Sequence, residues 1–497
     1  MSIPKVCGIE TEYGIVVRGG DNNPVTASSL LINAYVSATS RSNRGRVGWD
    51  FEDESPANDA RGFNLADVFA PEIETTLVNA VLPNGARYYV DHAHPEMSTP
   101  EVLTALEAVR WDRAADEIVR ASMEYAKAVL DGGEIVIYKN NSDGKGNSYG
   151  CHENYLMHRS VPFGRIATQI TPHFVTRQVF CGAGKVGCEQ PGRAPADVAF
   201  QLSQRADFFE EELGLETTLK RPIVNTRDEP HCDPQQYRRL HVIVGDANMS
   251  EVATYLKVGT TAIVLAMIED EALGDEWLLA NPVAAIRHIS HDPSLRATVM
   301  LRDGRRVTAL EVQWGLFERA KKYEQSHGLD AAGGAVGIDV LARWEAVLSG
   351  LEHDPASVAD QVDWVAKRRL VEGYAARHDI AAGDARLKAI DLQYHDLRPG
   401  KGLAERAGLV RMIDPADIAE AMRNPPTTTR AYFRGRCLQK FPAHIVAANW
   451  DSMVFDVGRD PLRRVPMMEP LRGTADHVAT LIDESNTVTE LLERLGA

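Results

Sequence analysis

The sequence predicts an α+β fold, with strands gathered in the first half of the chain and helices dominating a later part. Extended segments with alternating side chains open at Gly8 and recur at Ala86–Asp91 and Glu134–Lys139. Residues 290 to 395 instead show mainly helical periodicity, with a glycine-rich break at 332–337. Separate runs of strands and helices are typical of α+β proteins.

The length of the chain predicts two domains. At 497 residues the chain exceeds what one core usually holds, which favours a large domain followed by a smaller one. The Pro425-Pro426 pair marks the boundary, so we expect a catalytic domain over residues 1–425 and a small domain over 426–497. The small domain ends in a predicted amphipathic helix, Asp476–Leu495.

Charge and cysteine content exclude several classes of protein. The 70 acidic and 54 basic residues give a net charge of −16, which argues against broad binding to nucleic acid. The longest apolar stretch, about Val258–Ile268, is too short to span a bilayer, so no membrane association is expected. The six cysteines contain no CxxC pair. The sequence therefore predicts a reduced, cytoplasmic protein that is not secreted.

Two carboxylates mark the first strand, in the segment GIETEYG that begins at Gly8. In an extended strand Glu10 and Glu12 project to the same side, where they repel each other. A hard cation such as Mg²⁺ takes oxygen ligands of this kind. The alternative is a solvated edge strand with an alternating face.

The second strand presents Arg87, Tyr89 and Asp91 on one face. After it, the run Thr99-Pro100-Glu101 has the pattern of a helix start, with a capping residue, a first-turn proline and a first-turn acid. We expect a long helix from there to about Leu130, whose N-terminus points its partial positive charge at the strand.

Three further segments of the sequence predict a loop, a turn and a strand that leads into a helix. Residues 38 to about 75 form a long polar stretch with little periodicity, which is usually functional or disordered. The run Gly182–Lys185 lacks the GxxxxGK spacing of a phosphate loop and predicts a turn. A strand over Arg238–Asp246 places Arg239 and His241 on one face, and Asn248–Ser250 caps an apolar helix to about Ile268.

Several motifs taken in order carry a resemblance to a known family. They are GIETEYG, NGARYYVDHAHPE, GNSYGCHENYL, NTRDEPH with RRLHVIVGDANMSE, YHDLRPGKG and TTTRAYFRG. Together they cover nearly the whole chain, which resembles the Pup ligase and depupylase family, distant relatives of glutamine synthetase. The resemblance implies a glutamine synthetase-like, curved and mainly antiparallel sheet backed by helices, with a small C-terminal domain.

The family has two branches with opposite chemistry. The ligase branch uses ATP to join the C-terminal glutamate of Pup to a substrate lysine. The hydrolase branch deamidates the C-terminal glutamine of Pup and removes Pup from modified proteins. The DHAHPE motif and the polar insert at about 38–78 are similar to the hydrolase branch. The resemblance therefore implies hydrolysis, with ATP and Mg²⁺ as cofactors and Pup, pupylated proteins and the proteasomal ATPase as partners of a monomer.

The resemblance also implies roles for single residues. Asp91 matches the catalytic aspartate, and Glu10, Tyr89 and Glu96 match the Mg²⁺ ligands. His241 stands where glutamine synthetase has a glutamate, and its imidazole can still bind metal. The expected contacts to the nucleotide or to Pup carboxylates are Arg87, Thr99, His152, Arg205, Arg221, Arg227 and Arg239.

Several alternatives stay open at this point. Asp91 either activates water or attacks the amide carbon itself. The chain is alternatively a Pup–protein ligase, a glutamate–amine ligase acting on small molecules, or a catalytically silent binding protein. For Arg205, Arg221 and Arg227 the competing interpretation is a surface salt bridge. Trp450 is a candidate for stacking near the nucleotide, but a place in the core is the favoured interpretation.

Overall fold

A six-stranded antiparallel sheet forms the centre of the protein, in the order β13-β8-β1-β6-β5-β4. The computed structural model describes residues 1–20, 23–39, 47–52, 54–62, 77–130, 132–194, 197–458 and 461–496. The six strands are β1 (Cys7–Glu12), β4 (Asn79–Val81), β5 (Arg87–Asp91), β6 (His94–Ser98), β8 (Cys151–His158) and β13 (Tyr237–Val242). The predicted α+β class with a mainly antiparallel sheet is confirmed.

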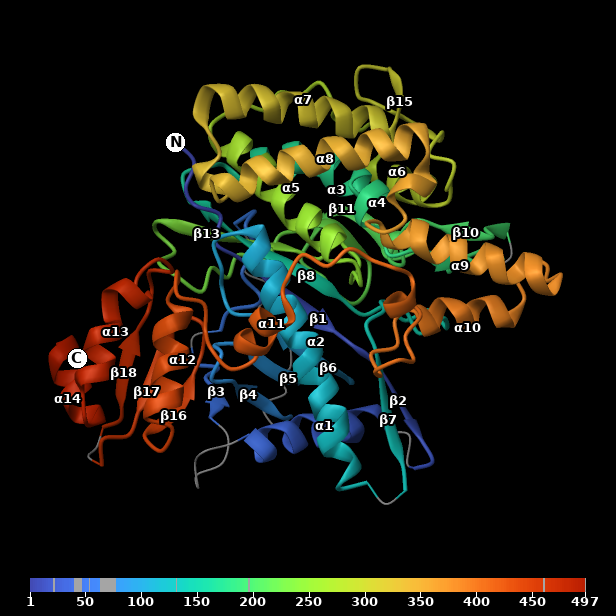
Figure 1. The fold of residues 1–497 in the computed structure, drawn as a ribbon. Helices are drawn as coiled ribbons and strands as arrows, with labels where there is room; N and C mark the ends of the chain where they lie inside the picture. The colour runs from blue at the N-terminus through green and yellow to red at the C-terminus, as the bar shows by residue number, and fades with distance from the viewer. Residues whose placement is uncertain are drawn as a thin grey trace.

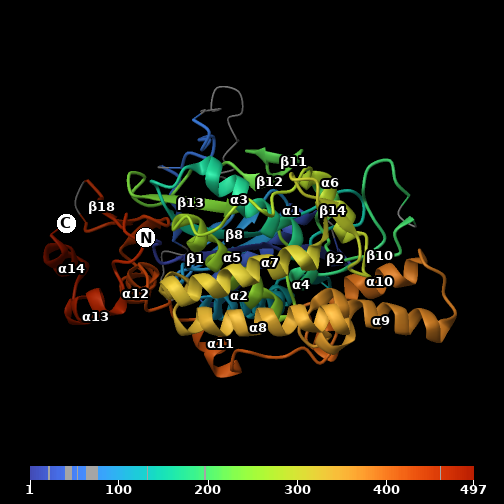
Figure 2. The ribbon, with the colours of Figure 1, turned by 90° about the horizontal axis from the view of Figure 1, so that it is seen from above.

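Helices cover one face of this sheet (Figures 1 and 2). Five of them contribute to one large hydrophobic cluster: α2 (Ala105–Lys127), α3 (Phe163–Thr176), α5 (Glu251–Glu269), α7 (Ala309–His327) and α8 (Ala335–His353). Among the described residues, α5 alone has the length and composition of a membrane span, and its apolar window is wholly buried. It is therefore a core helix, capped as predicted by Ser250.

The remaining elements of the large unit flank the sheet and its helices. They are β2 (Gly14–Arg18), α1 (Pro24–Thr39), β7 (Glu134–Tyr138), α4 (Gln178–Cys181), β9 (Lys185–Val186), β10 (Phe200–Gln201), η2 (Ala206–Phe208), β11 (Phe209–Gly214), β12 (Arg221–Asn225), α6 (Pro282–Ser290), β14 (Thr298–Met300), β15 (Arg306–Thr308), η3 (Asp330–Ala332), η4 (Pro355–Val358), α9 (Asp363–His378), α10 (Ala385–Tyr394), η5 (Ala404–Arg406) and α11 (Pro415–Ala421). The hairpin β14–β15 interrupts a region predicted to be helical. Much of the polar insert, residues 40–46, 53 and 63–76, lies outside the described residues.

The predicted helix start at Thr99 is wrong. Helix α2 begins at Ala105, where Thr104 is the N-cap and forms a capping box with Glu107. Thr99 instead continues the extended chain, because its backbone N–H donates to the carbonyl of Ile9 at 2.8 Å. Pairing with β1 thus carries the chain past Pro100 before it can turn into a helix, and no helix dipole points from Thr99 into the strand.

The C-terminal elements form a unit with a core of its own, shown in red in Figure 1. It contains α12 (Ala431–Lys440), β16 (Ile445–Ala448), β17 (Ser452–Phe455), β18 (Arg463–Pro466), α13 (Ala475–Glu484) and α14 (Val488–Leu495). The predicted single helix Asp476–Leu495 is wrong, because Ser485 is extended and Thr487 caps a new helix. A segment from the polar insert joins the unit, since β3 (Gly48–Trp49) pairs with β16.

Ion pairs through Glu101 dock this C-terminal unit onto the sheet. Its carboxylate accepts a hydrogen bond from Arg430 at 2.8 Å and another from Arg434, whose side chain is fully buried. Burial alone would raise the pKa of Glu101, but the two guanidinium groups lower it to about 2. The docking contact is therefore charged throughout the ordinary pH range.

We predict that Glu101→Gln lowers the free energy of unfolding by about 3 kcal/mol, because it leaves two buried arginines without their counter-charge. Chemical denaturation measures the change. The matched control is Glu124→Gln, which removes an exposed pair with Lys127 and should change stability by less than about 0.5 kcal/mol. Equal stability of the Glu101 variant and wild type would contradict the prediction.

Candidate functional site

The register of the central sheet gathers polar side chains into rows on the face opposite the helices. In one row Glu10 lies between His152 and Ser98. In the next row Glu12 faces Glu96, which in turn faces Tyr89. The burial of β1 and β5 alternates residue by residue, which confirms the predicted faces of both strands. Four strands therefore contribute to one polar surface.

This surface is the floor of a cleft of about 640 Å³. Its predicted site residues are Glu10, Arg87, Tyr89, Asp91, Glu96, His152, Arg227 and His241. Glu54 and Phe51, from the described part of the polar insert, also line the cleft, together with residues 215–218. Most of the residues predicted separately from sequence thus meet in one place.

One group on this polar surface consists only of carboxylates. Glu12, Asp91 and Glu96 each place an oxygen within 4.8 Å of the others. Burial, and then the charges of Asp91, Glu12 and Glu10, raise the pKa of Glu96 well above its usual range. The Tyr89 hydroxyl lies against this carboxyl and donates a hydrogen bond to it. Such a set of oxygens suits Mg²⁺, which would relieve the repulsion.

A second group combines one carboxylate with two imidazoles. Ligand atoms of Glu10, His152 and His241 lie within 4.8 Å of one another. The nearest approach of the His152 Nδ1 to the Glu10 carboxylate is 3.5 Å. Burial, and then the charge of Arg239, lower the pKa of His241 well below its usual range, so its ring is neutral. Neutral imidazole with carboxylate is a donor set that divalent metals accept.

Asp91 stands at the open end of the carboxylate group. Its side chain is 39% exposed, and the His92 Nδ1 lies 3.1 Å from its carboxylate. Burial alone would raise the pKa of Asp91, but the hydrogen bond and charge of His92 lower it. His92 has a φ of 50°, the left-handed region that tight turns between strands require. The turn thus keeps Asp91 ionised and within reach of a substrate.

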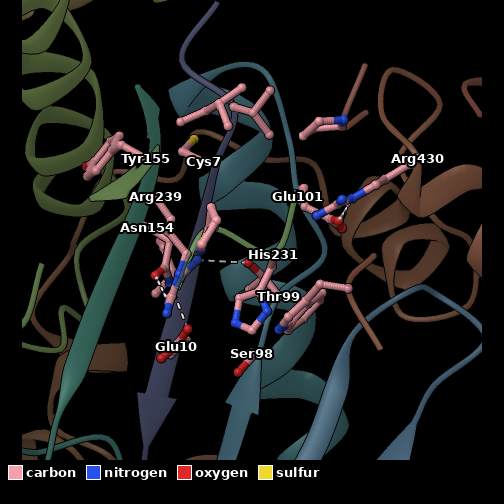
Figure 3. A pocket seen from close by; sticks show the side chains of 17 residues that line it. Cys7, Glu10, Ser98, Thr99, Glu101, Asn154, Tyr155, His231, Arg239 and Arg430 are labelled. Atoms are coloured by element: carbon pink, nitrogen blue, oxygen red, sulfur yellow. Dashed lines mark hydrogen bonds and ion pairs between the residues drawn. The ribbon is translucent and has the colours of Figure 1, made fainter. Parts of the chain in front are cut away.

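A narrow slot adjoins the cleft and shares Glu10 with it (Figure 3). Thr99 and Arg239 line this slot, as do Gly8 on β1 and Trp450 in the C-terminal unit. Gly8 leaves the floor open because it has no side chain. Trp450, interpreted from sequence as a core residue, is therefore also a wall of the slot, where a flat aromatic group could stack.

Arg87 is held between two aromatic rings. Its guanidinium carbon lies 4.0 Å from the centre of the Trp49 ring and 3.9 Å from that of Tyr89. Trp49 also packs edge-on against Trp450 at 5.2 Å. These contacts connect the slot to the cleft through the start of the polar insert, and they present the Arg87 charge toward the cleft.

The predicted arginines differ in their placement. Arg227 lines the cleft, whereas Arg205 lines neither the cleft nor the slot. The Arg205 side chain is 1% exposed and donates to the backbone carbonyls of Ile243 and Gly245. Its burial, and then the nearby charge of Arg221, lower its pKa to about 10. This placement does not support a direct contact with a ligand in the cleft.

Comparison with known proteins identifies the family. The family described as "Pup-ligase protein" matches residues 5–454. The chain belongs to the Pup-ligase family. A relative from Acidothermus cellulolyticus named "Depupylase" is 53% identical, with 99% of each chain covered. A relative from Mycobacterium tuberculosis named "Pup deamidase/depupylase" is 46% identical, also over 99% of each chain.

Two solved structures share the fold. The complex of Pup with its ligase PafA has a TM-score of 0.79 and 32% identity, covering 99% of this chain and 94% of that one. PafA bound to ADP has a TM-score of 0.72 and 36% identity, covering 82% of this chain and 89% of that one. The sequence-based assignment to the Pup-ligase family is therefore confirmed.

Several residues of the site have no role predicted from the sequence of this member of the Pup-ligase family. They are Glu54, Asn154 and Trp49. Alternation along β8 could have indicated Asn154, because it shares a strand face with His152. Glu54 and Trp49 gave no such signal. Pairing of β3 with β16 places Trp49 beside Arg87, and the indole N–H of Trp49 donates to Glu54, which lines the cleft.

We predict that Mg²⁺ binding releases a proton from Glu96. Because the folded pKa of Glu96 is raised, the metal-free protein keeps a proton at pH values where the unfolded chain has lost it. The apparent Mg²⁺ affinity should therefore rise with pH, while the metal-free protein loses stability over the same range. Calorimetric titration in buffers of different ionisation enthalpy counts the protons released.

The variant Glu96→Gln should abolish most of this release and weaken binding, whereas the exposed Glu345→Gln should change neither. If Glu96→Gln releases as many protons as wild type, the assignment to Glu96 is wrong.

Proposed function

We propose that this chain is a Pup deamidase and depupylase, which hydrolyses the amide of a C-terminal glutamine of Pup and the isopeptide bond between Pup and a substrate lysine. The observation that carries the proposal is the full-length match to relatives named depupylase at 53% and 46% identity. Relatives named "Pup--protein ligase" match at 40–41% identity and over 81–82% of this chain, which makes ligation the second candidate.

The cleft supports cation-dependent chemistry next to a nucleotide. We propose that Mg²⁺ is held by Glu10, His152 and His241 at one position and by Glu12 and Glu96, beside Tyr89, at another. Bound there, Mg²⁺ would neutralise the carboxylates and polarise the oxygens of phosphate or amide groups. We propose that the slot between Thr99, Arg239 and Trp450 takes the base of ATP, while Arg87 and Arg227 face its phosphates. The ADP complex of PafA supports a nucleotide site in this fold.

Asp91 is the proposed catalytic residue, and two routes lead from it to the same products. In the first, its carboxylate oxygen forms a bond to the amide carbon, the C–N bond breaks, and the nitrogen takes a proton from solvent and leaves as ammonia or as the lysine amine. Water then cleaves the mixed anhydride, which frees the carboxyl group of Pup and restores Asp91. In the second, Asp91 takes a proton from water as the water oxygen attacks the amide carbon. The C–N bond then breaks, and Asp91 passes that proton to the departing nitrogen. Both routes use its ionised form, which His92 favours.

The remaining assignments stay predictions. The division at residue 425 gains support from the separate core of the C-terminal unit, to which β3 must be added. We propose that the polar insert acts on the nucleotide site, because Trp49 contacts both Arg87 and Trp450. A monomeric state, contact with the proteasomal ATPase and a cytoplasmic location rest on the sequence alone, although all six cysteines are free thiols in the structure.

We predict that Asp91→Asn lowers the rate of ammonia release from glutamine-ended Pup by about a hundredfold or more, because it removes the attacking or proton-accepting oxygen. Binding of labelled Pup should persist, as measured by fluorescence anisotropy. The control Asp476→Asn, on an exposed helix of the C-terminal unit, should keep full activity.

Formation of a Pup–lysine conjugate by the wild type, with matching ATP turnover and without ammonia release, would contradict hydrolysis and favour the ligase. Full activity in Asp91→Asn would remove Asp91 from the mechanism.

A further inference from the structure

Asn154 lies on β8, the middle one of the three strands that supply Glu10, His152 and His241. On β8 it is two residues from His152, so both side chains lie on the cleft side of the sheet. Its register partners are Gly8 on β1 and His241 on β13. Because Gly8 has no side chain, the Asn154 amide has room to reach Glu10 in the neighbouring row.

The orientation of the Asn154 amide is fixed by its two charged neighbours (Figure 3). The Glu10 carboxylate can only accept, so the amide group that lies 2.7 Å from it must be the NH₂. The Arg239 guanidinium can only donate, so the atom 2.7 Å from its NH1 must be the carbonyl oxygen Oδ1. A flipped amide would place its carbonyl oxygen against the Glu10 carboxylate and its NH₂ against the Arg239 guanidinium, so neither hydrogen bond could form.

This orientation decides which nitrogen of His241 carries the proton. The His241 Nδ1 lies 3.0 Å from the same Oδ1, and only a protonated Nδ1 can form a hydrogen bond with an acceptor. The Arg239 NH1 approaches that nitrogen at a longer 3.3 Å. The protonation state of Nδ1 is therefore assigned from its closer contact, which is with Oδ1. In a neutral imidazole a protonated Nδ1 leaves the lone pair on Nε2.

We propose that Asn154 is a positioning residue for the cation site, which holds the Glu10 carboxylate with its NH₂ and fixes His241 in the Nδ1–H form with its carbonyl. Nε2 of His241 is then the nitrogen available to a cation shared with Glu10 and His152. Outer contacts of this kind orient metal ligands, and losing one costs about 10–100-fold in metal affinity. The inference rests on the proposed function, since it concerns the cation that hydrolysis would use.

Manganese provides a direct test, because its pulsed EPR spectrum shows nitrogen modulation only when an imidazole is a ligand. The carboxylate group of Glu12, Asp91 and Glu96 contains no nitrogen and stays silent. In Asn154→Leu, which removes the hydrogen bonds to Glu10, Arg239 and His241, the Mn²⁺ concentration for half-maximal nitrogen modulation should rise by about 10–100-fold. The exposed Asn486→Leu should match wild type, and thermal unfolding checks that each variant folds.

Selective ¹⁵N labelling of histidine tests the tautomer without metal. The His241 signals, assigned by their loss in His241→Gln, should show a protonated Nδ1 and an unprotonated Nε2 in wild type. Asn154→Asp keeps an acceptor and should keep this form, whereas Asn154→Leu should lose it. The inference is overturned if wild-type His241 carries its proton on Nε2, or if Asn154→Leu binds Mn²⁺ with unchanged nitrogen modulation.

These outcomes are separate from those of the proposed function. If the wild type hydrolyses Pup amides and Asn154→Leu binds manganese as the wild type does, only the role of Asn154 is rejected. Absence of hydrolysis in the wild type would reject the function, whatever the state of His241.

Discussion

Repulsion among four carboxylates on one sheet face is the constraint on which the site depends. Glu10, Glu12, Glu96 and Asp91 are brought together by strand register, and burial, with the charges of the other three carboxylates, raises the pKa of Glu96 well above its usual range. Glu10 is grouped with two histidines, and the other three carboxylates form a group of their own. The proposed cations would offset this repulsion between the carboxylates.

Buried contacts elsewhere in the protein hold the strands in place despite the repulsion between these carboxylates. Tyr13 directly follows Glu12, and behind the sheet its hydroxyl donates a hydrogen bond to Asp116. The Asp116 carboxylate also accepts a hydrogen bond from the fully buried Lys139. On the side of the C-terminal unit, Glu101 binds two arginines from α12 and its N-terminal flank. These buried contacts fix the end of β1 and the segment after β6, so the strands that carry the carboxylates cannot drift apart.

Sequence patterns predicted the parts of the site that depend on local geometry. Alternation along a strand placed Glu10 with Glu12 and Arg87 with Asp91, because a period of two is set within a few residues. The grouping of His152 with Glu10 and His241 depends on the register of three strands, which alternation does not specify. Thr99 was assigned to a helix start because its local signal was strong, but pairing with β1 overrode it. Trp49 reaches Arg87 only through the C-terminal sheet, and nothing in its neighbours indicated that.

The central claim is that cations hold this carboxylate face together. It is tested most directly by anomalous diffraction from crystals grown with Mn²⁺ and a non-hydrolysable ATP analogue. The account predicts manganese peaks in the cleft, one in contact with Glu10 and His241 and one in contact with Glu96. A well-ordered nucleotide with no manganese peak touching either Glu10 or Glu96 would contradict it.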